Sequence, residues 1–306
     1  MSGPYSYKGP VDCTVLPDEA HCNGKSIVIT GGAQGIGEAY VRGFVKAGSF
    51  VTFCDINEEA GAKLEAELGP ENVCFIRADT RSWDDQVRMF EAAVSKSPQK
   101  SVDLVIANAG VGRGSGDPMM TLEDPNTAPT KPSMHIIDIN LIGVMYTLKL
   151  AIHYFRRSPM AADRDRCFIF GGSVAGFVDN LSSWEYSTSK FGLRGLMRTV
   201  RRQSYHQGIR VAYIAPSYVR TVIQSQQVYE SIRAKGLDFA TTESCLAAVM
   251  RIACDKTING HSFAIVPETV AKEGFIDLDQ DDFKGEKGYL ATFQDDVVRL
   301  RGDDWP

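Results

Sequence analysis

The chain has 306 residues, of which 43% are hydrophobic and 23% charged, a composition that excludes disordered and collagen-like proteins. Its 33 basic and 38 acidic residues give a net charge of −5. The basic residues occur in pairs rather than in long clusters, so the charge pattern does not predict nucleic-acid binding. The seven scattered cysteines contain no Cys-x-x-Cys motif and no metal-ligand spacing. We therefore expect a soluble protein of a reducing compartment, with no disulfide framework and no metal site.

The first 24 residues carry three prolines and lack the apolar core that a secretory signal needs. No later segment approaches the ~18 uninterrupted apolar residues of a membrane span. The sequence therefore predicts a cytoplasmic protein that does not bind a membrane.

From Lys25 onward, short apolar runs alternate with longer amphipathic segments. The predicted strands are Ser26–Thr30, Phe50–Asp55, Val73–Ala78, Asp103–Ala107, Arg166–Phe170, Ile209–Ile214 and Ser262–Val266. The predicted helices are Glu38–Ala47, Glu58–Leu68, Trp83–Ser95, Pro132–Arg157, Glu185–Gln207 and Thr242–Cys254. Nearly continuous apolar strands are typical of a parallel sheet buried on both faces. We expect one α/β domain over residues 25–267, a doubly wound Rossmann fold with a seven-stranded parallel sheet, between extensions 1–24 and 268–306.

Three stretches interrupt the alternation: a Gly/Pro/Thr-rich loop at 110–131, a polar insertion at 222–240 and the acidic tail 268–306. Long loops are usually functional, and the first two would leave the carboxyl ends of strands, where ligands bind in such sheets. We expect these two to be substrate loops. The tail lacks strong periodicity, and its aromatic residues suggest that it folds back over the pocket or a neighbouring subunit.

A glycine-rich loop, Thr30–Gly37, joins the first strand to the first helix. Glycines at 31, 35 and 37 permit a tight turn, allow backbone amides to approach a pyrophosphate and let the helix pack closely on the strand. A plain glycine turn is the alternative, but the position between strand and helix favours a dinucleotide site.

Asp55 ends the second predicted strand, near the position of the acid that binds an adenosine ribose. Its carboxylate would repel a 2′-phosphate, and Gln34 in the glycine loop supplies no compensating cation. The sequence thus predicts NAD(H) in preference to NADP(H). In the alternative interpretation, Asp55 only caps the next helix.

Tyr186 and Lys190 lie one helical turn apart on the same predicted helix face. Ser173 precedes them by thirteen residues, at the end of the fifth predicted strand, and would face the same crevice. A solvated helix face is the alternative for the pair, and a strand-end cap is the alternative for Ser173.

At these positions the sequence resembles the short-chain dehydrogenase/reductase family, over about 240 residues. The likeness includes the loop Thr30–Gly37, Asp55, Asp79-Thr80, Asn108-Ala109-Gly110, Asn140, Ser173, the Tyr186/Lys190 pair and the segment Pro216–Thr221. A weaker likeness points to the hydroxyprostaglandin-dehydrogenase-like and fungal secondary-metabolite members. The family usually has glycine where this chain has Ser217, which affects the expected backbone and nicotinamide orientation there.

The resemblance implies a catalytic tetrad of Asn140, Ser173, Tyr186 and Lys190. It places Asp79 and Asn108 at the adenosine and Val219 with Thr221 at the nicotinamide amide. The full predicted set of cofactor-binding residues is Gly31, Gln34, Gly35, Ile36, Gly37, Asp55, Asp79, Thr80, Asn108, Ala109, Gly110, Tyr186, Lys190, Pro216, Val219 and Thr221.

The chemistry explains these residue types independently. Removing a hydride from a carbinol carbon requires a base near the hydroxyl proton. Lys190 and an oxidised nicotinamide can favour the phenolate of Tyr186, which makes it that base. Ser173 would hold the substrate oxygen and Asn140 would anchor a water, although Asn140 could also be a polar residue that only bends its helix.

Apolar side chains near the expected pocket predict a bulky hydrophobic secondary alcohol, or its ketone, as substrate. They are Met119, Met120, Val174, Phe177, Val178, Trp184, Tyr218 and Val222, and core packing is the alternative for each. A homodimer or homotetramer is expected through the helices 132–157 and 185–207. The candidate contacts are Ile152, Phe155, Phe191, Leu193 and Met197, with burial inside the chain as the alternative.

The leading hypothesis is an NAD(H)-dependent alcohol dehydrogenase or ketoreductase. A non-redox isomerisation, dehydration or cyclisation at the same site is the second hypothesis. A non-catalytic dinucleotide-binding protein is the third, and the intact tetrad argues against it.

Overall fold

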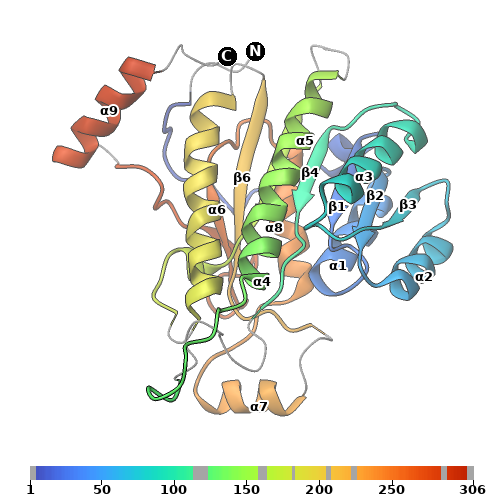
Figure 1. The fold of residues 1–306 in the computed structure, drawn as a ribbon. Coiled ribbons are helices and arrows are strands. Elements are labelled where there is room, and N and C mark those ends of the chain that lie inside the picture. The colour runs from blue at the N-terminus through green and yellow to red at the C-terminus, as the bar shows by residue number, and fades with distance from the viewer. Residues whose placement is uncertain are drawn as a thin grey trace.

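The computed structural model describes residues 5–112, 123–157, 164–180, 183–204, 208–221, 226–283 and 288–301, and shows a twisted sheet between two layers of helices (Figure 1). The sheet has eight strands in the order β3-β2-β1-β4-β5-β6-β7-β8. The strands are β1 Ser26–Thr30, β2 Phe50–Asp55, β3 Val73–Arg77, β4 Leu104–Ala107, β5 Arg166–Gly171, β6 Ile209–Pro216, β7 Ser262–Ile265 and β8 Phe275–Asp277. This arrangement confirms the predicted doubly wound α/β class.

The first seven strands are parallel and agree closely with the predicted ones, while β8 runs antiparallel to β7. The predicted number of seven strands was wrong by this one edge strand. With only three residues, inside an acidic segment, β8 carries too little alternation to be recognised locally.

The helices cover the two faces of the sheet. They are α1 Gly35–Lys46, α2 Glu58–Leu68, α3 Trp83–Lys96, α4 His135–Ile137, α5 Val144–Arg157, α6 Trp184–Gln203, α7 Gln226–Ala234, α8 Thr242–Cys254 and α9 Tyr289–Arg301. The short segments are the 3-10 helices η1 Glu19–Cys22 and η4 Val174–Gly176 and the π-helical turn η3 Asp138–Gly143. Side chains of α1 and α8 build the core on one face, and those of α3, α5 and α6 build the core on the other.

Two stretches expected to be irregular contain helices. The polar insertion holds α7, which lies at the carboxyl end of the sheet, below β6 in Figure 1. The tail holds β8 and α9, and α9 lies near the opposite end of α6, at the upper left of Figure 1. The tail from β8 onward therefore lies away from the carboxyl edge, whereas its first residues form the β7–β8 turn at that edge, where the Thr269 hydroxyl donates to Asp238 Oδ2 of the insertion (3.4 Å).

Both extensions pack against each other at the β8 edge. The Val11 amide donates to Asp277 Oδ2 (2.8 Å), and the Tyr5 and Tyr7 hydroxyls donate to Asp282 Oδ2 (2.6 Å) and Asp279 Oδ1 (2.7 Å). The N-terminal extension is thus fastened to the C-terminal one, across more than 260 residues of sequence.

One helical stretch in the described part of the chain, His135–Arg157, is long and apolar enough by length and composition to cross a membrane. Scattered polar residues interrupt the stretch without much lowering its mean hydropathy, so it contains no run of ~18 uninterrupted apolar residues, which is the feature that the sequence was expected to lack. In the protein, 44% of its most apolar 18-residue segment is buried. Leu148, Ala151 and Phe155 pack in the core that α3, α5 and α6 build on one face of the sheet. A core helix of a soluble protein commonly has these properties.

Candidate active site

The glycine loop forms a cradle that only glycine can build. Gly31 and Gly35 have positive φ angles, +64° and +59°. A Cβ on Gly37 would lie 1.9 Å from Gly31 O and 2.7 Å from Asn108 Nδ2. Gln34 occupies the N-cap position of α1 without a side-chain capping bond, and Ile36 packs against the core that α1 and α8 build on one face of the sheet. The loop therefore brings the amino end of α1 close to β1, which is the geometry that suits a pyrophosphate.

We expect Gly37→Ala to weaken dinucleotide binding at least tenfold and to destabilise the protein by about 1–3 kcal/mol, because its methyl group would push the loop and α1 apart. Isothermal titration with NADH and urea unfolding measure the two effects. Gly195→Ala is the matched control, since a Cβ there meets nothing within 4 Å on α6. That change should stabilise the helix by roughly 0.5–1 kcal/mol. Normal NADH binding by Gly37→Ala would contradict the role of the glycine loop in holding the dinucleotide.

Asp55 connects the glycine loop to the turn before α2. Its Oδ2 accepts the Ala33 amide (3.1 Å) and its Oδ1 accepts the Asn57 amide (3.0 Å). The side chain that caps α2 is that of Asn57, which accepts the Ala60 amide. Asp55 is therefore not the helix cap of the alternative interpretation, and its carboxylate lies beside the loop, where a ribose would be bound.

The backbone around the cradle is held by hydrogen bonds of Asn108, Ala109 and Thr80. Asn108 Nδ2 donates to Thr30 O (3.2 Å) and Gly31 O (2.9 Å), and the Ala109 amide donates to Thr30 Oγ1 (3.0 Å). Thr80 is buried, and its carbonyl accepts Gln86 Nε2 (2.6 Å), which also donates to Gly143 O (2.8 Å). These bonds fasten the glycine loop to β4 and the residues after β3 to η3.

Asp79 has a partner that the sequence did not suggest. Arg81 contacts the Asp79 carboxylate through Nε and Nη2 (2.6–3.1 Å) and lowers its pKa below the ordinary value. Asp79 and Arg81 line a cavity of about 410 Å³ together with Asp138 and Tyr146, among others. No residue of the predicted tetrad lines this cavity, so it is not the expected reaction site.

The tetrad residues reach the carboxyl edge of the sheet from three elements. Asn140 lies in the π turn η3, fully buried, where its side chain exchanges two hydrogen bonds with the Val111 backbone (2.8 and 2.9 Å). Such π turns are rare and frequently occur at functional sites. A Cβ built on Gly110 would lie 3.3 Å from Asn140 Oδ1 and 3.7 Å from Lys190 Nζ. Asn140, Gly110 and Lys190 thus meet at one point.

Tyr186 and Lys190 lie together on α6, with Lys190 Nζ 5.4 Å from the centroid of the Tyr186 ring. Lys190 Nζ donates to Gly171 O (2.9 Å), and burial lowers the Lys190 pKa to about 8. Burial raises the pKa of Tyr186, and its hydrogen bond with Ser173 acts in the opposite direction. Ser173 Oγ also accepts the Ala175 amide (3.1 Å) and contacts Pro216 O (3.3 Å). Tyr186 and Ser173 can therefore contact the same substrate oxygen.

The segment after β6 is held by α7. The Thr221 amide donates to the Tyr229 hydroxyl (2.7 Å), which donates back to Thr221 O (2.5 Å), and Val219 pairs with Ala240. Ser217 continues the β6–β7 pairing through its amide and Ile265 O (3.1 Å), and its φ is not positive. Serine at this position, where the family usually has glycine, therefore strains no backbone. Neither Arg81 nor Tyr229 was identified by sequence. Tyr229 reaches Thr221 only because α7 folds back on the segment after β6. Arg81 lies two residues from Asp79 but belongs to none of the motifs considered.

The expected pocket residues fall into three groups. Val174 and Phe177 are partly buried, whereas Val178, Trp184 and Tyr218 are exposed. Met119, Met120 and Val222 lie outside the described residues.

The fold and the site together define a doubly wound domain with a glycine cradle and a tyrosine–lysine pair at the same sheet edge. The family model described as short chain dehydrogenase matches residues 25–231. The 5'-hydroxyaverantin dehydrogenase of Dothistroma septosporum is 33% identical over 280 residues, covering 86% of this chain and 90% of the relative. The enzyme of the same name from Emericella nidulans is 30% identical, covering 89% and 92%.

Two solved structures share the fold. A 3-ketoacyl-(acyl-carrier-protein) reductase from Brucella melitensis, complexed with NADH, has a TM-score of 0.67 at 21% identity and covers 80% of this chain and 97% of that protein. A short-chain type dehydrogenase/reductase from Mycobacterium marinum has a TM-score of 0.69 at 20% identity, covering 83% and 98%. This chain belongs to the short-chain dehydrogenase/reductase family. It is an oxidoreductase of that family, whose fold binds a nicotinamide dinucleotide.

Proposed function

We propose that the protein interconverts a hydrophobic secondary alcohol and its ketone with NAD(H). The observation that carries this proposal is the meeting of Tyr186, its partner Ser173, Lys190 and Asn140 beside the glycine cradle. Two relatives whose names specify the dehydrogenation of a hydroxy compound support it. The apolar side chains of Val174 and Phe177 on the turn after Ser173 favour an apolar substrate.

In the proposed reaction, Tyr186 takes the hydroxyl proton of the alcohol, and Ser173 donates a hydrogen bond to the same oxygen. Oxidised nicotinamide, when held at the glycine cradle, would supply the acceptor for the hydride of the carbinol carbon. Lys190, with its ammonium beside the Tyr186 ring, favours the phenolate, and Asn140 holds the chain near Lys190 so that the proton can leave through water. Ketone reduction uses the same groups in reverse, with Tyr186 as the acid.

The direct test is to incubate the protein with NAD or NADH and a panel of hydrophobic secondary alcohols and ketones, and to follow the absorbance of reduced nicotinamide. We expect turnover of bulky apolar substrates. Product formation without any change in absorbance would instead favour a non-redox reaction at this site. Dinucleotide binding without any product would favour a non-catalytic binding protein.

The preference for NAD(H) over NADP(H) is part of the proposal, and it depends on Asp55. Two relatives are named NADP-dependent, and the exposed Arg77 lies beside Asp55 in the sheet register, so a cation is near the ribose position. The Asp55 carboxylate is nearer to the glycine loop, because it bonds the Ala33 amide. We therefore propose that the repulsion of a 2′-phosphate by Asp55 is stronger than its attraction by Arg77.

We expect Asp55→Ser to lower kcat/KM for NAD about tenfold and to raise it for NADP, because the change removes both the ribose acceptor and the repulsion of a 2′-phosphate. Steady-state kinetics with both dinucleotides measure the ratio. Asp84→Ser, an exposed acid in the first turn of α3, is the control and should leave the ratio unchanged. A wild-type protein that prefers NADP would overturn the assignment.

We also propose a cytoplasmic homodimer or homotetramer. Of the five contact residues expected from sequence, Phe155, Leu193 and Met197 are fully buried inside the chain and cannot form a subunit contact. Ile152 is partly buried and Phe191 is 46% exposed, so these two are left as candidates. Light scattering of the purified protein measures the oligomeric state.

A further inference from the structure

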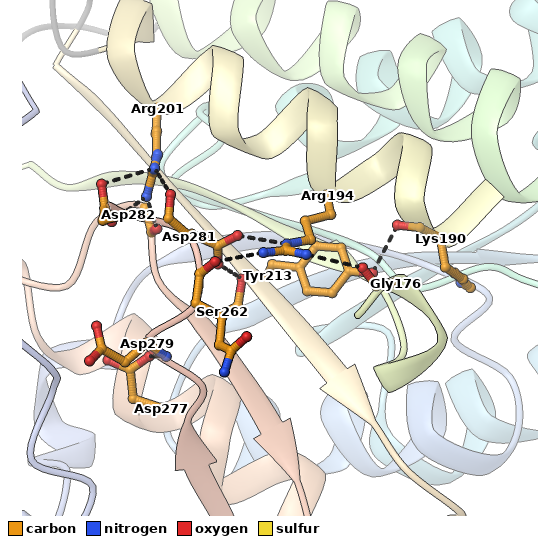
Figure 2. Close-up of polar contacts among 12 residues, drawn as sticks. Gly176, Lys190, Arg194, Arg201, Tyr213, Ser262, Asp277, Asp279, Asp281 and Asp282 are labelled. Atoms are coloured by element: carbon orange, nitrogen blue, oxygen red, sulfur yellow. Dashed lines mark hydrogen bonds and ion pairs between the residues drawn. The ribbon is translucent and has the colours of Figure 1, made fainter. Parts of the chain in front are cut away.

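The turn after Ser173 packs on a buried tyrosine, Tyr213. The Ser173 amide donates to the Tyr213 hydroxyl (3.2 Å). That hydroxyl in turn donates to Lys190 O (3.1 Å), as Figure 2 shows. A Cβ on Gly172 would lie 1.9 Å from the ring, and one on Gly176 would lie 2.7 Å from the hydroxyl. Tyr213 thus connects the backbones of two proposed catalytic residues, and glycines make room for it.

Arg194 holds the other end of the same turn. It follows Lys190 by one helical turn on α6, and its guanidinium lies 3.9 Å from the centroid of the Phe177 ring. Its Nη1 contacts Gly176 O at 3.4 Å. The Phe177 ring in turn meets Tyr213 edge to face, at 5.9 Å between centroids. The turn is therefore enclosed between Tyr213 and Arg194.

The C-terminal extension fixes the position of Arg194. Asp281 Oδ1 accepts Arg194 Nε (2.8 Å) and Gln280 O accepts Nη2 (2.6 Å). Asp281 is only 4% exposed, and its second oxygen accepts the Ser262 hydroxyl of β7 (2.5 Å). A charge-assisted bond in such a buried place is stronger and more directional than one at the surface. Figure 2 shows Asp281 between Ser262 and Arg194.

A second arginine fastens the same segment further along α6. Arg201 is fully buried and donates to Asp281 O (2.6 Å), to both carboxylate oxygens of Asp282 (3.0 and 3.1 Å) and to the Tyr5 hydroxyl (2.8 Å). The contacts of Gln280–Asp282 with α6 therefore have two parts. The Arg194 part touches the turn after Ser173, and the Arg201 part, with Tyr5, lies away from it.

We propose that Arg194 is a positioning residue for the substrate, through which the C-terminal segment Gln280–Asp282 holds the Ser173–Phe177 turn against α6. This inference rests on the proposed function, in which Ser173 at one end of the turn contacts the reacting oxygen and Phe177 at the other end belongs to the apolar side chains expected at the pocket. The segment Gln280–Asp282 thereby acts on substrate binding from the β8 edge.

The alternative is that the arginine contacts only stabilise the docked tail. Three variants separate the two roles. Arg194→Met removes the bonds to the tail and turn, Asp281→Asn keeps the shape and weakens the ion pair, and Tyr5→Phe loosens the Arg201 part alone. All three should lower the melting temperature if docking is weakened, so stability by itself does not decide.

The deciding readouts are hydrogen exchange of the turn and the kinetic constants. The amides of Gly176, Phe177 and Val178 are bonded to carbonyls within the turn, so their exchange reports its opening. We expect about tenfold faster exchange in Arg194→Met, a smaller increase in Asp281→Asn and no change in Tyr5→Phe. The KM for the alcohol should rise about tenfold in Arg194→Met, while the dissociation constant of NADH stays the same.

Exchange in Arg194→Met equal to that of the wild type would overturn the proposal, as would equal acceleration by Tyr5→Phe. If Arg194→Met does not fold, the comparison of Asp281→Asn with Tyr5→Phe gives the same decision. A wild-type protein without redox activity would contradict the proposed function, but the exchange measurement needs no turnover and would still test the positioning role.

Discussion

Replacing Tyr186 by phenylalanine should lower kcat for alcohol oxidation by about 10³-fold, because general acid–base catalysis typically contributes 10²–10⁴ and no other described phenol lies at the Lys190 ammonium. Dinucleotide affinity should change little, since the ring remains and only the hydroxyl is lost. Stopped-flow measurement of nicotinamide reduction, with the enzyme in excess, isolates the chemical step.

The matched control for this change is Tyr289→Phe. Tyr289 is 78% exposed and lies at the start of α9, away from the carboxyl edge, so loss of its hydroxyl should leave kcat nearly unchanged. Retention of more than a tenth of wild-type kcat by Tyr186→Phe would assign the proton transfer to another group.

The second large effect concerns Lys190, whose replacement by methionine should abolish most activity and yet stabilise the fold at neutral pH. The Lys190 pKa is lowered by burial from 10.5 to about 8. Below pH 8 the side chain is protonated in both the folded and the unfolded chain, and the folded state carries the full cost of a buried ammonium. At ~1.4 kcal/mol per pH unit, that cost is about 3 kcal/mol.

The sign of the pH dependence follows from this difference. The folded-state pKa is below the unfolded one, so the penalty decreases as the pH rises from about 8 and disappears above 10.5. Lys190→Met also leaves Gly171 O without its donor, a loss of about 1 kcal/mol, so we expect a net gain of about 2 kcal/mol at pH 7. Urea unfolding at pH 7 and at pH 10.5 measures the free energy of unfolding.

Lys46→Met is the control for Lys190→Met, because Lys46 is an exposed lysine at the end of α1 and its loss should not change stability. A lower free energy of unfolding of Lys190→Met at pH 7 would show that burial of the Lys190 ammonium does not destabilise the folded state. A gain in stability that persists unchanged at pH 10.5 would show the same. Such a cost at neutral pH is typical of residues retained for function rather than for folding.

Much of the fold could be predicted from sequence because it depends on local patterns. The helices Glu58–Leu68 and Thr242–Cys254 have the same bounds in the structure as in the prediction, since an amphipathic period and a capping side chain, Asn57 or Thr241, define each of them locally. The single helix predicted over 132–157 was less accurate. In the structure it begins at His135 and contains the π turn η3.

The candidate site was predicted as a set of residues, but the connections between them were not. Asp55 is joined to the glycine loop, Asn140 to the Val111 backbone and Thr221 to Tyr229, and none of these bonds follows from a motif. Short motifs specify residue types, whereas the partner of each side chain depends on which backbone groups the packed elements bring within hydrogen-bond distance.

The sequence by itself determined how strands and crossover helices follow one another along the chain, and where the motifs lie. Hydrophobic period, glycine spacing and strand ends are properties of neighbouring residues, so they can be recognised without the fold. Only the tertiary structure decided what the two extensions do. Arg194 meets Asp281 across 87 residues, and Tyr5 meets Asp282 across 277. Contacts so distant in the chain leave no local periodicity, since they form only when the sheet and α6 already hold their partners in place.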